Sequence, residues 1–384
     1  MSGIYIHIPF CKQACHYCDF HFSTSLKKKD ELIEAIQHEL VLRKNELPNQ
    51  FVETIYFGGG TPSLLTLDEI DSILKTIYDN YDVSETPEIT LEANPDDLNE
   101  DKILELAKSD VNRLSIGIQS FFEDDLKLMN RAHNADEAYK CLDLATTHFD
   151  NISIDLIYGI PGLSNDYWLK NIETALSYNL PHISSYALTV EPKTALAKFI
   201  ENGKIPDVDD EVAQQQYNIL VNKLEASGFV NYEISNFGKP GWFSKNNTAY
   251  WLGKPYLGIG PSAHSYDGIS RSWNVANNSK YIKSITENKL PSESETLSQE
   301  NRFNEAVMTG LRTVWGVSLA KIEAEFGQEF LKHLMKNSQK YISEGLLELK
   351  NPTIEKLANH EVLTITKKGK FLCDGIASDL FILN

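Results

Sequence analysis

Short apolar runs alternate with amphipathic stretches from residue 4 to residue 227, and this alternation constrains the fold more than any other feature. Such alternation is typical of a parallel sheet wrapped by helices, because each parallel strand needs a long crossover connection. We predict six strands, at Ile4–Ile8, Thr54–Phe57, Glu88–Leu91, Arg113–Ile118, Ile152–Ile157 and Ile183–Leu188. Six strand–helix units fall short of the eight of a closed barrel. We therefore expect an α/β fold, a partial (β/α)6 barrel of the TIM type that is open at one side.

Helix-like stretches lie between and after these strands, and the pattern changes toward the end of the chain. The clearest helices are predicted at Asp30–Leu47, Leu67–Tyr81, Asn165–Tyr178 and Asp209–Ser227. Thr66 and Glu69 form a capping box at the start of the second. After residue 291, three helical stretches precede two short apolar runs, Leu346–Leu349 and Val362–Thr366, and a last helix. We expect a barrel over residues 1–235, an aromatic-rich connecting segment over 236–290, and a smaller α+β, winged-helix-like domain over 291–384.

Three of the five cysteines, Cys11, Cys15 and Cys18, lie in one short loop directly after the first predicted strand. An iron–sulfur cube of the [4Fe–4S] type normally takes four thiolates, so this C-x3-C-x2-C loop would leave one iron open to a small molecule. Two other interpretations stay open on spacing alone. His16 or His21 would complete a Cys3His zinc site, or the three thiols are reduced and structural. The odd cysteine count and the absence of a leader-like segment argue against a disulfide framework.

Polar residues and glycines gather at the carboxyl ends of the predicted strands. They are the run Gly58-Gly59-Gly60-Thr61-Pro62, Glu92, Gln119, Asp155 and Tyr186. In barrel folds the loops at these ends build the active site. A buried carboxyl group needs a partner, and a bound ligand is one. Each residue taken singly is equally well explained as a helix cap, but the set favours a ligand site. The glycine run is neither a Walker A loop nor a dinucleotide-binding fingerprint.

Taken together, these segments resemble the oxygen-independent coproporphyrinogen oxidase family of radical S-adenosylmethionine (SAM) proteins over nearly the whole chain. The carrying segments are 7–11, 17–20, 56–62, 117–120 and 155–162. Within the family the chain is most similar to the haem chaperone branch. Asp19 and Phe20 stand where the decarboxylating enzyme has Gly-Cys, and only Met1 to Gly3 precede the first predicted strand, where that enzyme carries a long extension.

The resemblance implies roles for residues of the barrel. Cys11, Cys15 and Cys18 would be the ligands of a [4Fe–4S] cluster, with SAM on the open iron. The residues implied to contact the cluster-bound SAM or to line its cavity are Tyr5, Tyr17, Gly59, Gly60, Thr61, Glu92, Gln119, Arg131 and Asp155. Arg131 would offer a bidentate fork to a carboxylate, and its alternative interpretation is a surface arginine at a helix end. No residue is assigned as catalytic.

The haem motif of the chaperone branch, His-Asn-x-x-Tyr-Trp, is altered in this chain. Asn247, Tyr250 and Trp251 match it, but Asn246 stands in the histidine position. An amide is a poor axial ligand beside imidazole, thiolate or phenolate. The candidate haem ligands are therefore Tyr250 and His264, although a structural role explains His264 as well. Surrounding aromatic residues suit a porphyrin face, and ordinary packing between domains also explains them.

The net charge of the chain and its lack of long apolar runs limit the classes of function that fit it. A net charge of −18 argues against a general nucleic-acid binder, which would need a basic face. No apolar run is long enough to cross a bilayer, and we expect a cytoplasmic protein. Our leading hypothesis is a haem chaperone that passes haem to an unidentified acceptor protein. A homodimer and a membrane contact made through the acceptor are compatible with it. The alternatives are oxygen-independent coproporphyrinogen III oxidase and a haem-free radical enzyme.

Overall fold

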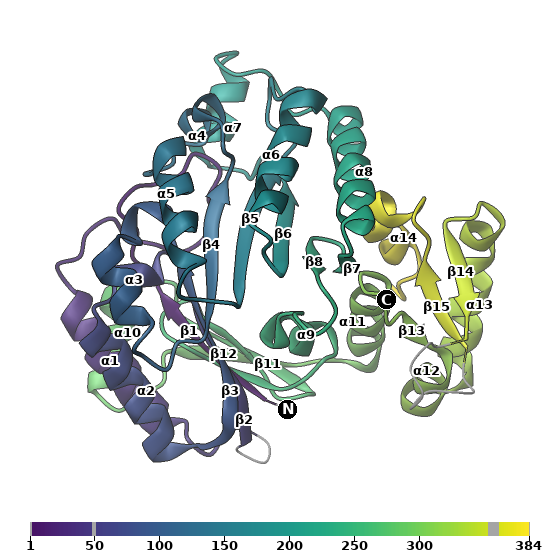
Figure 1. The fold of residues 1–384 in the computed structure, drawn as a ribbon. Coiled ribbons are helices and arrows are strands. Elements are labelled where there is room, and N and C mark those ends of the chain that lie inside the picture. Colours follow the sequence, from purple (N-terminus) through teal and green to yellow (C-terminus); the bar gives the residue numbers. More distant parts are fainter. Residues whose placement is uncertain (1, 48–50, 352–360, 384) are drawn as a thin grey trace.

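The computed structural model describes residues 2–47, 51–351 and 361–383. Its centre is a set of six parallel strands that lie side by side in chain order (Figure 1). They are β1 (Gly3–Ile8), β2 (Phe51–Gly59), β3 (Asp82–Ala93), β4 (Arg113–Gln119), β5 (Ile152–Tyr158) and β6 (His182–Ala187). The six predicted strands are confirmed, and the sheet curls into a partial barrel.

Helices cover the outside of this barrel (Figure 1). They are α1 (Lys29–Leu42), α2 (Leu67–Asn80), α3 (Glu100–Leu106), α4 (Glu123–Leu128), α5 (Ala135–Ala145), α6 (Asn165–Ser177), α7 (Ala195–Glu201) and α8 (Asp210–Ala226). The capping box predicted for α2 is confirmed, because the Thr66 hydroxyl accepts from the Glu69 N–H and the Glu69 carboxylate accepts from the Thr66 N–H. The range predicted for α1, Asp30–Leu47, extends beyond the end of the observed helix. That helix ends at Leu42, and Arg43 turns its side chain into the core instead of continuing the helical face.

Strands from the later part of the chain extend both edges of the barrel sheet. Beside β1 lie β9 (Tyr256–Ile259), β10 (His264–Tyr266), β11 (Ser270–Asn274) and β12 (Ser292–Thr296), and beside β6 lie β8 (Asn236–Gly238) and β7 (Val230–Glu233). The pairing of β9 with β1 is parallel, whereas β10, β11 and β12 add antiparallel strands. Two short helices, α9 (Lys245–Trp251) and α10 (Asn278–Thr286), lie between these strands in the chain. The stretch that we expected to be a connecting segment therefore contributes to the main sheet.

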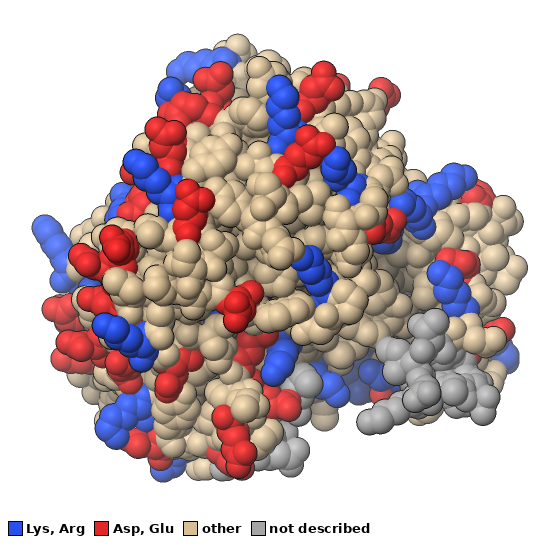
Figure 2. Space-filling view, viewed as in Figure 1, with Lys and Arg blue, Asp and Glu red and all other residues tan. Residues whose placement is uncertain are grey.

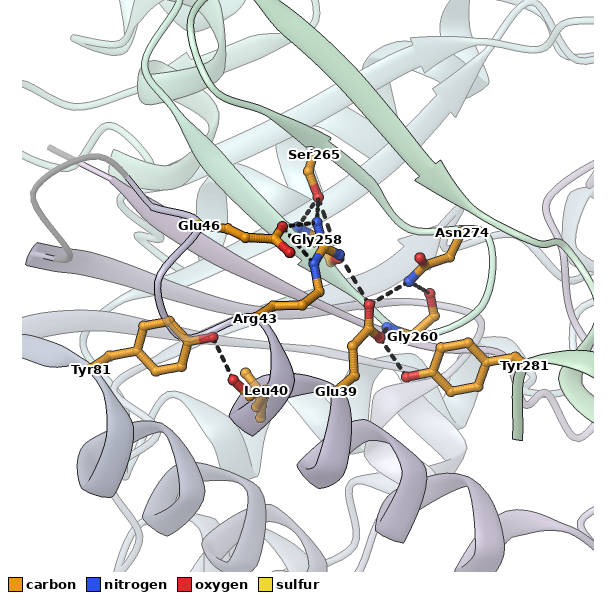
Figure 3. Close-up of polar contacts among 10 residues, drawn as sticks. All are labelled: Glu39, Leu40, Arg43, Glu46, Tyr81, Gly258, Gly260, Ser265, Asn274 and Tyr281. Carbon is orange, nitrogen blue, oxygen red and sulfur yellow. Dashed lines mark hydrogen bonds and ion pairs between the residues drawn. The ribbon is translucent and has the colours of Figure 1, made fainter. Parts of the chain in front are cut away.

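A buried polar cluster fastens this extension to α1 (Figure 3). The Glu39 carboxylate is fully buried and accepts hydrogen bonds from the Asn274 amide at 2.7 Å, the Tyr281 hydroxyl at 2.5 Å and the Gly260 N–H at 2.8 Å. Arg43 forms an ion pair with Glu39 at 3.0 Å, and its guanidinium also donates to a backbone carbonyl of β9. Because every partner of this carboxylate is buried, its charge is compensated within the protein.

The end of the chain folds around a second, smaller core. It contains α11 (Gln299–Leu311), β13 (Val317–Ser318), α12 (Leu319–Phe326), α13 (Gln328–Ser343), β14 (Leu347–Lys350), β15 (Val362–Ile365) and α14 (Cys373–Asp379). The predicted pairing of the two short apolar runs is confirmed as the antiparallel pair β14–β15. Arg312 joins this C-terminal unit to the barrel through an ion pair with Glu233 at 3.0 Å. Within the described residues, no helix combines the length and the apolar character needed to cross a bilayer.

Candidate functional site

The three clustered cysteines lie on the loop that follows β1, at the carboxyl end of the barrel strands. The loop closes on itself, because the Cys11 N–H donates to the Ser23 carbonyl at 3.1 Å and the Ser23 N–H donates to the Pro9 carbonyl at 2.9 Å. Cys11, Cys15 and Cys18 are all partly exposed free thiols. In the described part of the chain, no three His, Cys, Asp or Glu side chains converge as ligands of one metal ion. A [4Fe–4S] cube takes one thiolate on each of three irons when the fourth iron is left open, and the three thiols of this loop supply that donor set.

Arg131 lies against the cysteine loop. One guanidinium nitrogen is 3.3 Å from the Cys15 sulfur, and the other donates to the Asn94 side chain at 2.6 Å and to the Gly117 carbonyl at 2.9 Å. The same group also interacts with Tyr17, whose pKa is raised by burial. The surface interpretation of Arg131 is therefore wrong. Arg131 therefore places a positive charge beside the cysteine loop.

The glycine turn after β2 is a place where side chains do not fit. A Cβ atom on Gly58 would lie 2.8 Å from the Tyr5 ring and 2.9 Å from the Tyr56 ring. A Cβ atom on Gly60 would lie 2.6 Å from the Phe10 carbonyl oxygen, and Gly59 has a φ of +107°. The turn therefore packs its backbone closely against tyrosine rings and against the chain that leads into the cysteine loop, and only glycine fits there.

Two carboxyl groups face the interior of the barrel from β3 and β5. Glu92 accepts hydrogen bonds from the Tyr56 hydroxyl at 2.8 Å and from the Gly59 N–H at 3.1 Å. Burial nevertheless raises the pKa of Glu92 to about 7, and the charge of Asp155 adds to this rise. Burial likewise raises the pKa of Asp155 to about 6, against the lowering influence of Ser184 and of Arg113. This pair forms an anionic pocket near neutral pH that suits a cationic ligand.

The remaining residues implied for the barrel cavity lie beside these groups. The Thr61 hydroxyl accepts from the Asn94 amide at 3.3 Å and contacts Cys11. Gln119 is a buried residue with a φ of +65°, and its amide nitrogen would be 2.9 Å from a Cβ on Gly117. The structure therefore brings together, at one end of the barrel, all the residues that the sequence implied for the cluster and SAM.

A cavity of about 890 Å³ lies where the open side of the barrel meets the C-terminal unit. Its lining includes Tyr186, Tyr250, Trp251, Tyr256, Tyr266, Arg271, Arg302, Arg312 and Trp315. Tyr186, one residue of this lining, lies within range of the charges of Asp155 and Glu92 inside the barrel. Its size suits a large organic ligand. A second cavity of about 730 Å³ lies near the amino ends of β4 and β5 and contains none of the predicted site residues.

The two candidate haem ligands lie in different places. Tyr250 lines the cavity, and its ring packs edge-on against Tyr256 with centroids 4.4 Å apart. His264 is exposed on β10 beside Trp273 and is not part of the lining. Asn246 is buried, and its side-chain oxygen accepts from the Thr54 hydroxyl at 3.1 Å. Its amide is therefore committed to the scaffold.

Several residues of this site were not identified from the sequence. The Tyr56 hydroxyl donates a hydrogen bond to Glu92. The Asn94 side chain accepts one from Arg131 and donates one to Thr61. Tyr56 carries one signal, since it lies two residues before the glycine run in strand β2. Asn94 and the cavity arginines carry none, because only the folding of the chain brings them to the site.

Comparisons with known proteins agree with this geometry. Residues 5–177 match the model of the radical SAM superfamily, and residues 297–354 match that of the HemN C-terminal domain. The heme chaperone HemW of Bacillus subtilis is 36% identical over 335 residues, covering 85% of this chain and 88% of that protein. The heme chaperone HemW of Mycobacterium tuberculosis is 31% identical, covering 98% of this chain and 94% of that protein.

A solved structure gives the same fold. Coproporphyrinogen III oxidase (HemN) of Escherichia coli, a radical SAM enzyme, superposes with a TM-score of 0.83, covering 99% of this chain and 90% of that chain. At 22% sequence identity, this likeness establishes the shared architecture of barrel and C-terminal unit and nothing about the substrate.

Proposed function

The chain belongs to the family of the heme chaperone HemW, within the radical SAM superfamily, and from that premise we propose that it binds haem and transfers it to an acceptor protein. The observation that carries the proposal is similarity to heme chaperones along almost the whole chain, including 98% coverage by the relative from Mycobacterium tuberculosis. Haem is the cargo in this scheme, and the cluster and SAM belong to the barrel.

We assign the barrel end to the cluster and SAM. Bound together, a [4Fe–4S] cluster and SAM supply a reducing electron and a cleavable C–S bond. Cys11, Cys15 and Cys18 would hold the cluster, and Arg131 would compensate the negative charge of the thiolates. Glu92 would accept a hydrogen bond from the SAM amino group in its ionised form. Gly58 and Gly60 have no room for side chains, so the glycine turn would lie close to the cysteine loop and bring the ligands of the cluster and of SAM together.

We assign the haem to the cavity beside the barrel, with Tyr250 rather than His264 as axial ligand. Three observations support this choice. Tyr250 lines the cavity, His264 is not part of that lining, and the phenol of tyrosine is a known haem ligand. Burial raises the pKa of Tyr250, so iron would have to displace its proton on binding. The rings of Tyr256 and Trp251 would pack against the macrocycle.

Haem titration under anaerobic conditions tests the proposal. We expect a saturable Soret band from the wild-type protein, and a shift or loss of that band in Tyr250→Phe but not in His264→Ala. A wild-type protein without a saturable band has no haem role. The reverse behaviour of the two variants would move the axial ligand to β10.

The rival function is decarboxylation of coproporphyrinogen III, the alternative that the sequence resemblance leaves open. An anaerobic assay of the reconstituted protein with coproporphyrinogen III and SAM separates the two functions. We expect no tetrapyrrole decarboxylation. Turnover to a product with fewer carboxyl groups would replace the chaperone assignment with the enzyme.

A further inference from the structure

Arg302 is a cation with no anionic partner among the residues that the structure describes. It lies on α11 and lines the 890 Å³ cavity, and its guanidinium makes no hydrogen bond or ion pair with any residue that the structure describes. Its Nε atom is buried and has no acceptor. A buried donor without an acceptor destabilises the protein, so a position of this kind is satisfied when a ligand supplies the missing oxygen.

Arg312 provides the contrast within the same cavity. Its Nε atom is likewise buried without an acceptor, but its terminal nitrogens form ion pairs with Glu233 and Asp374, and its guanidinium carbon lies 5.0 Å from the centroid of the Trp251 ring. Its charge is therefore used to join the C-terminal unit to the barrel. Arg302 makes no such ion pair with any residue that the structure describes.

A second arginine, Arg271 on β11, lies near the same place. It forms an ion pair with Glu305, which is one helical turn beyond Arg302 on α11. The charges of Glu305, Arg271, Asp267 and Arg302 all act on Tyr266, so the four groups lie within electrostatic range of one ring. Two cations and two anions thus lie near this ring, and of the two cations only Arg271 has an ion pair among the described residues. Acidic side chains gather elsewhere, over the outer helices around α2 and α3 (Figure 2).

A row of aromatic rings connects this charged corner with the barrel. Tyr250 packs on Tyr256 with centroids 4.4 Å apart, and Tyr256 packs near Tyr266 with centroids 6.4 Å apart. At the barrel end, Tyr250 lies close enough for its charge to act on Tyr5. A flat ligand lying along these rings would therefore present one edge to the barrel and the opposite edge to Arg302 and Arg271.

We propose that Arg302 and Arg271 bind the carboxylate side chains of the tetrapyrrole cargo, and so fix which edge of the macrocycle faces the barrel. The assignment rests on the proposed function, in that the cargo is a haem. Arginine forks recognise carboxylates with two parallel hydrogen bonds, and a haem carries its two propionates on one edge. Arg302 takes the first propionate directly. Arg271 binds the second propionate, either while it keeps its ion pair with Glu305 or after that ion pair breaks.

Haem and its dimethyl ester separate carboxylate recognition from ring packing. Affinities of both compounds are measured by absorbance titration for the wild-type protein, Arg302→Gln and Arg302→Lys. Lys321→Gln is the matched control, because Lys321 also lines the cavity but lies 3.8 Å from Glu325. Iron content and far-UV circular dichroism report whether each variant is folded and holds its cluster.

We expect Arg302→Gln to weaken haem binding about tenfold or more, as for loss of a charged hydrogen bond, and to leave the affinity for the ester unchanged. Arg302→Lys should recover part of the loss, and Lys321→Gln should change either affinity less than about twofold. Equal weakening of haem and ester by Arg302→Gln would overturn the assignment, as would a wild-type protein that binds the ester as tightly as haem. A wild-type protein that binds neither compound overturns the proposed function and this assignment together.

Discussion

Ionisation of Glu92 should control SAM binding across neutral pH. Burial raises the pKa of this carboxyl to about 7, from an ordinary value near 4.5. Only the ionised form accepts the hydrogen bond that we assign to the SAM amino group, so the contribution of Glu92 is present above pH 7 and is lost as the pH falls through it. One pH unit below this pKa, Glu92 is ionised in about a tenth of the protein molecules. The factor by which Glu92 strengthens SAM binding should therefore fall about tenfold by pH 6.

The readout must separate Glu92 from SAM itself, whose amino group also titrates, with an ordinary pKa of about 7.7–8.0. We therefore take the ratio of the SAM dissociation constants of Glu92→Gln and wild type, measured anaerobically at pH 6, 7 and 8. A charged hydrogen bond contributes about 1.5–3 kcal/mol, so the ratio should be at least about tenfold at pH 8 and shrink toward one at pH 6.

Asp155→Asn is the internal control, because Asp155 faces the same pocket and its charge raises the pKa of Glu92. In the Asp155→Asn background the ratio of SAM dissociation constants should still fall with falling pH, but the fall should occur at lower pH. Loss of the negative charge of Asp155 lowers the pKa of Glu92. A ratio that stays constant between pH 6 and pH 8 would refute the reasoning, because it would mean that the ionisation of Glu92 does not change over this range.

Two further substitutions test the scaffold of the site. Glu39→Ala removes the buried acceptor of Asn274 and Tyr281 and leaves Arg43 with Glu46 as its remaining anion, so it should lower the free energy of unfolding by about 3–5 kcal/mol, measured by urea denaturation. A loss below about 1 kcal/mol would contradict the role of this cluster in holding β9–β11. Gly58→Ala would press a Cβ atom into two tyrosine rings and should weaken SAM binding about tenfold in equilibrium dialysis, with iron content unchanged. Gly375→Ala, where a Cβ meets nothing within 4 Å, should leave SAM binding as it is, and equal effects of both glycine variants would argue against a steric cause.

The sequence predicts the barrel well because its signals are local. Each of the six parallel strands is an apolar run, and the start of α2 is marked by the Thr66–Glu69 capping box within four residues. The cysteine loop and the glycine turn follow directly on two of these strands, so their meeting at one end of the sheet follows from the parallel arrangement alone.

The extension of the sheet and the cavity depend on contacts that are remote in the chain. Strand β9 pairs with β1 across about 250 residues, and no periodicity in either segment specifies that partner. The same holds for Arg302, whose neighbours Tyr266 and Arg271 lie on a different structural unit. From the sequence alone, a single arginine on a helix is expected to lie at the surface, because the strands that face it across the cavity are not known. Asn246 was a departure from the family motif, and its hydrogen bond with Thr54 gives that departure a structural role.

The central claim, that three cysteines hold a cluster with one iron open to SAM, is tested by electron paramagnetic resonance of the anaerobically reconstituted, reduced protein. We predict a cluster signal whose g-values change when SAM is added, no cluster in Cys15→Ala, and an unaltered spectrum in Cys141→Ala, where the thiol is buried in α5. A signal indifferent to SAM, or equal iron in the two variants, would contradict the account.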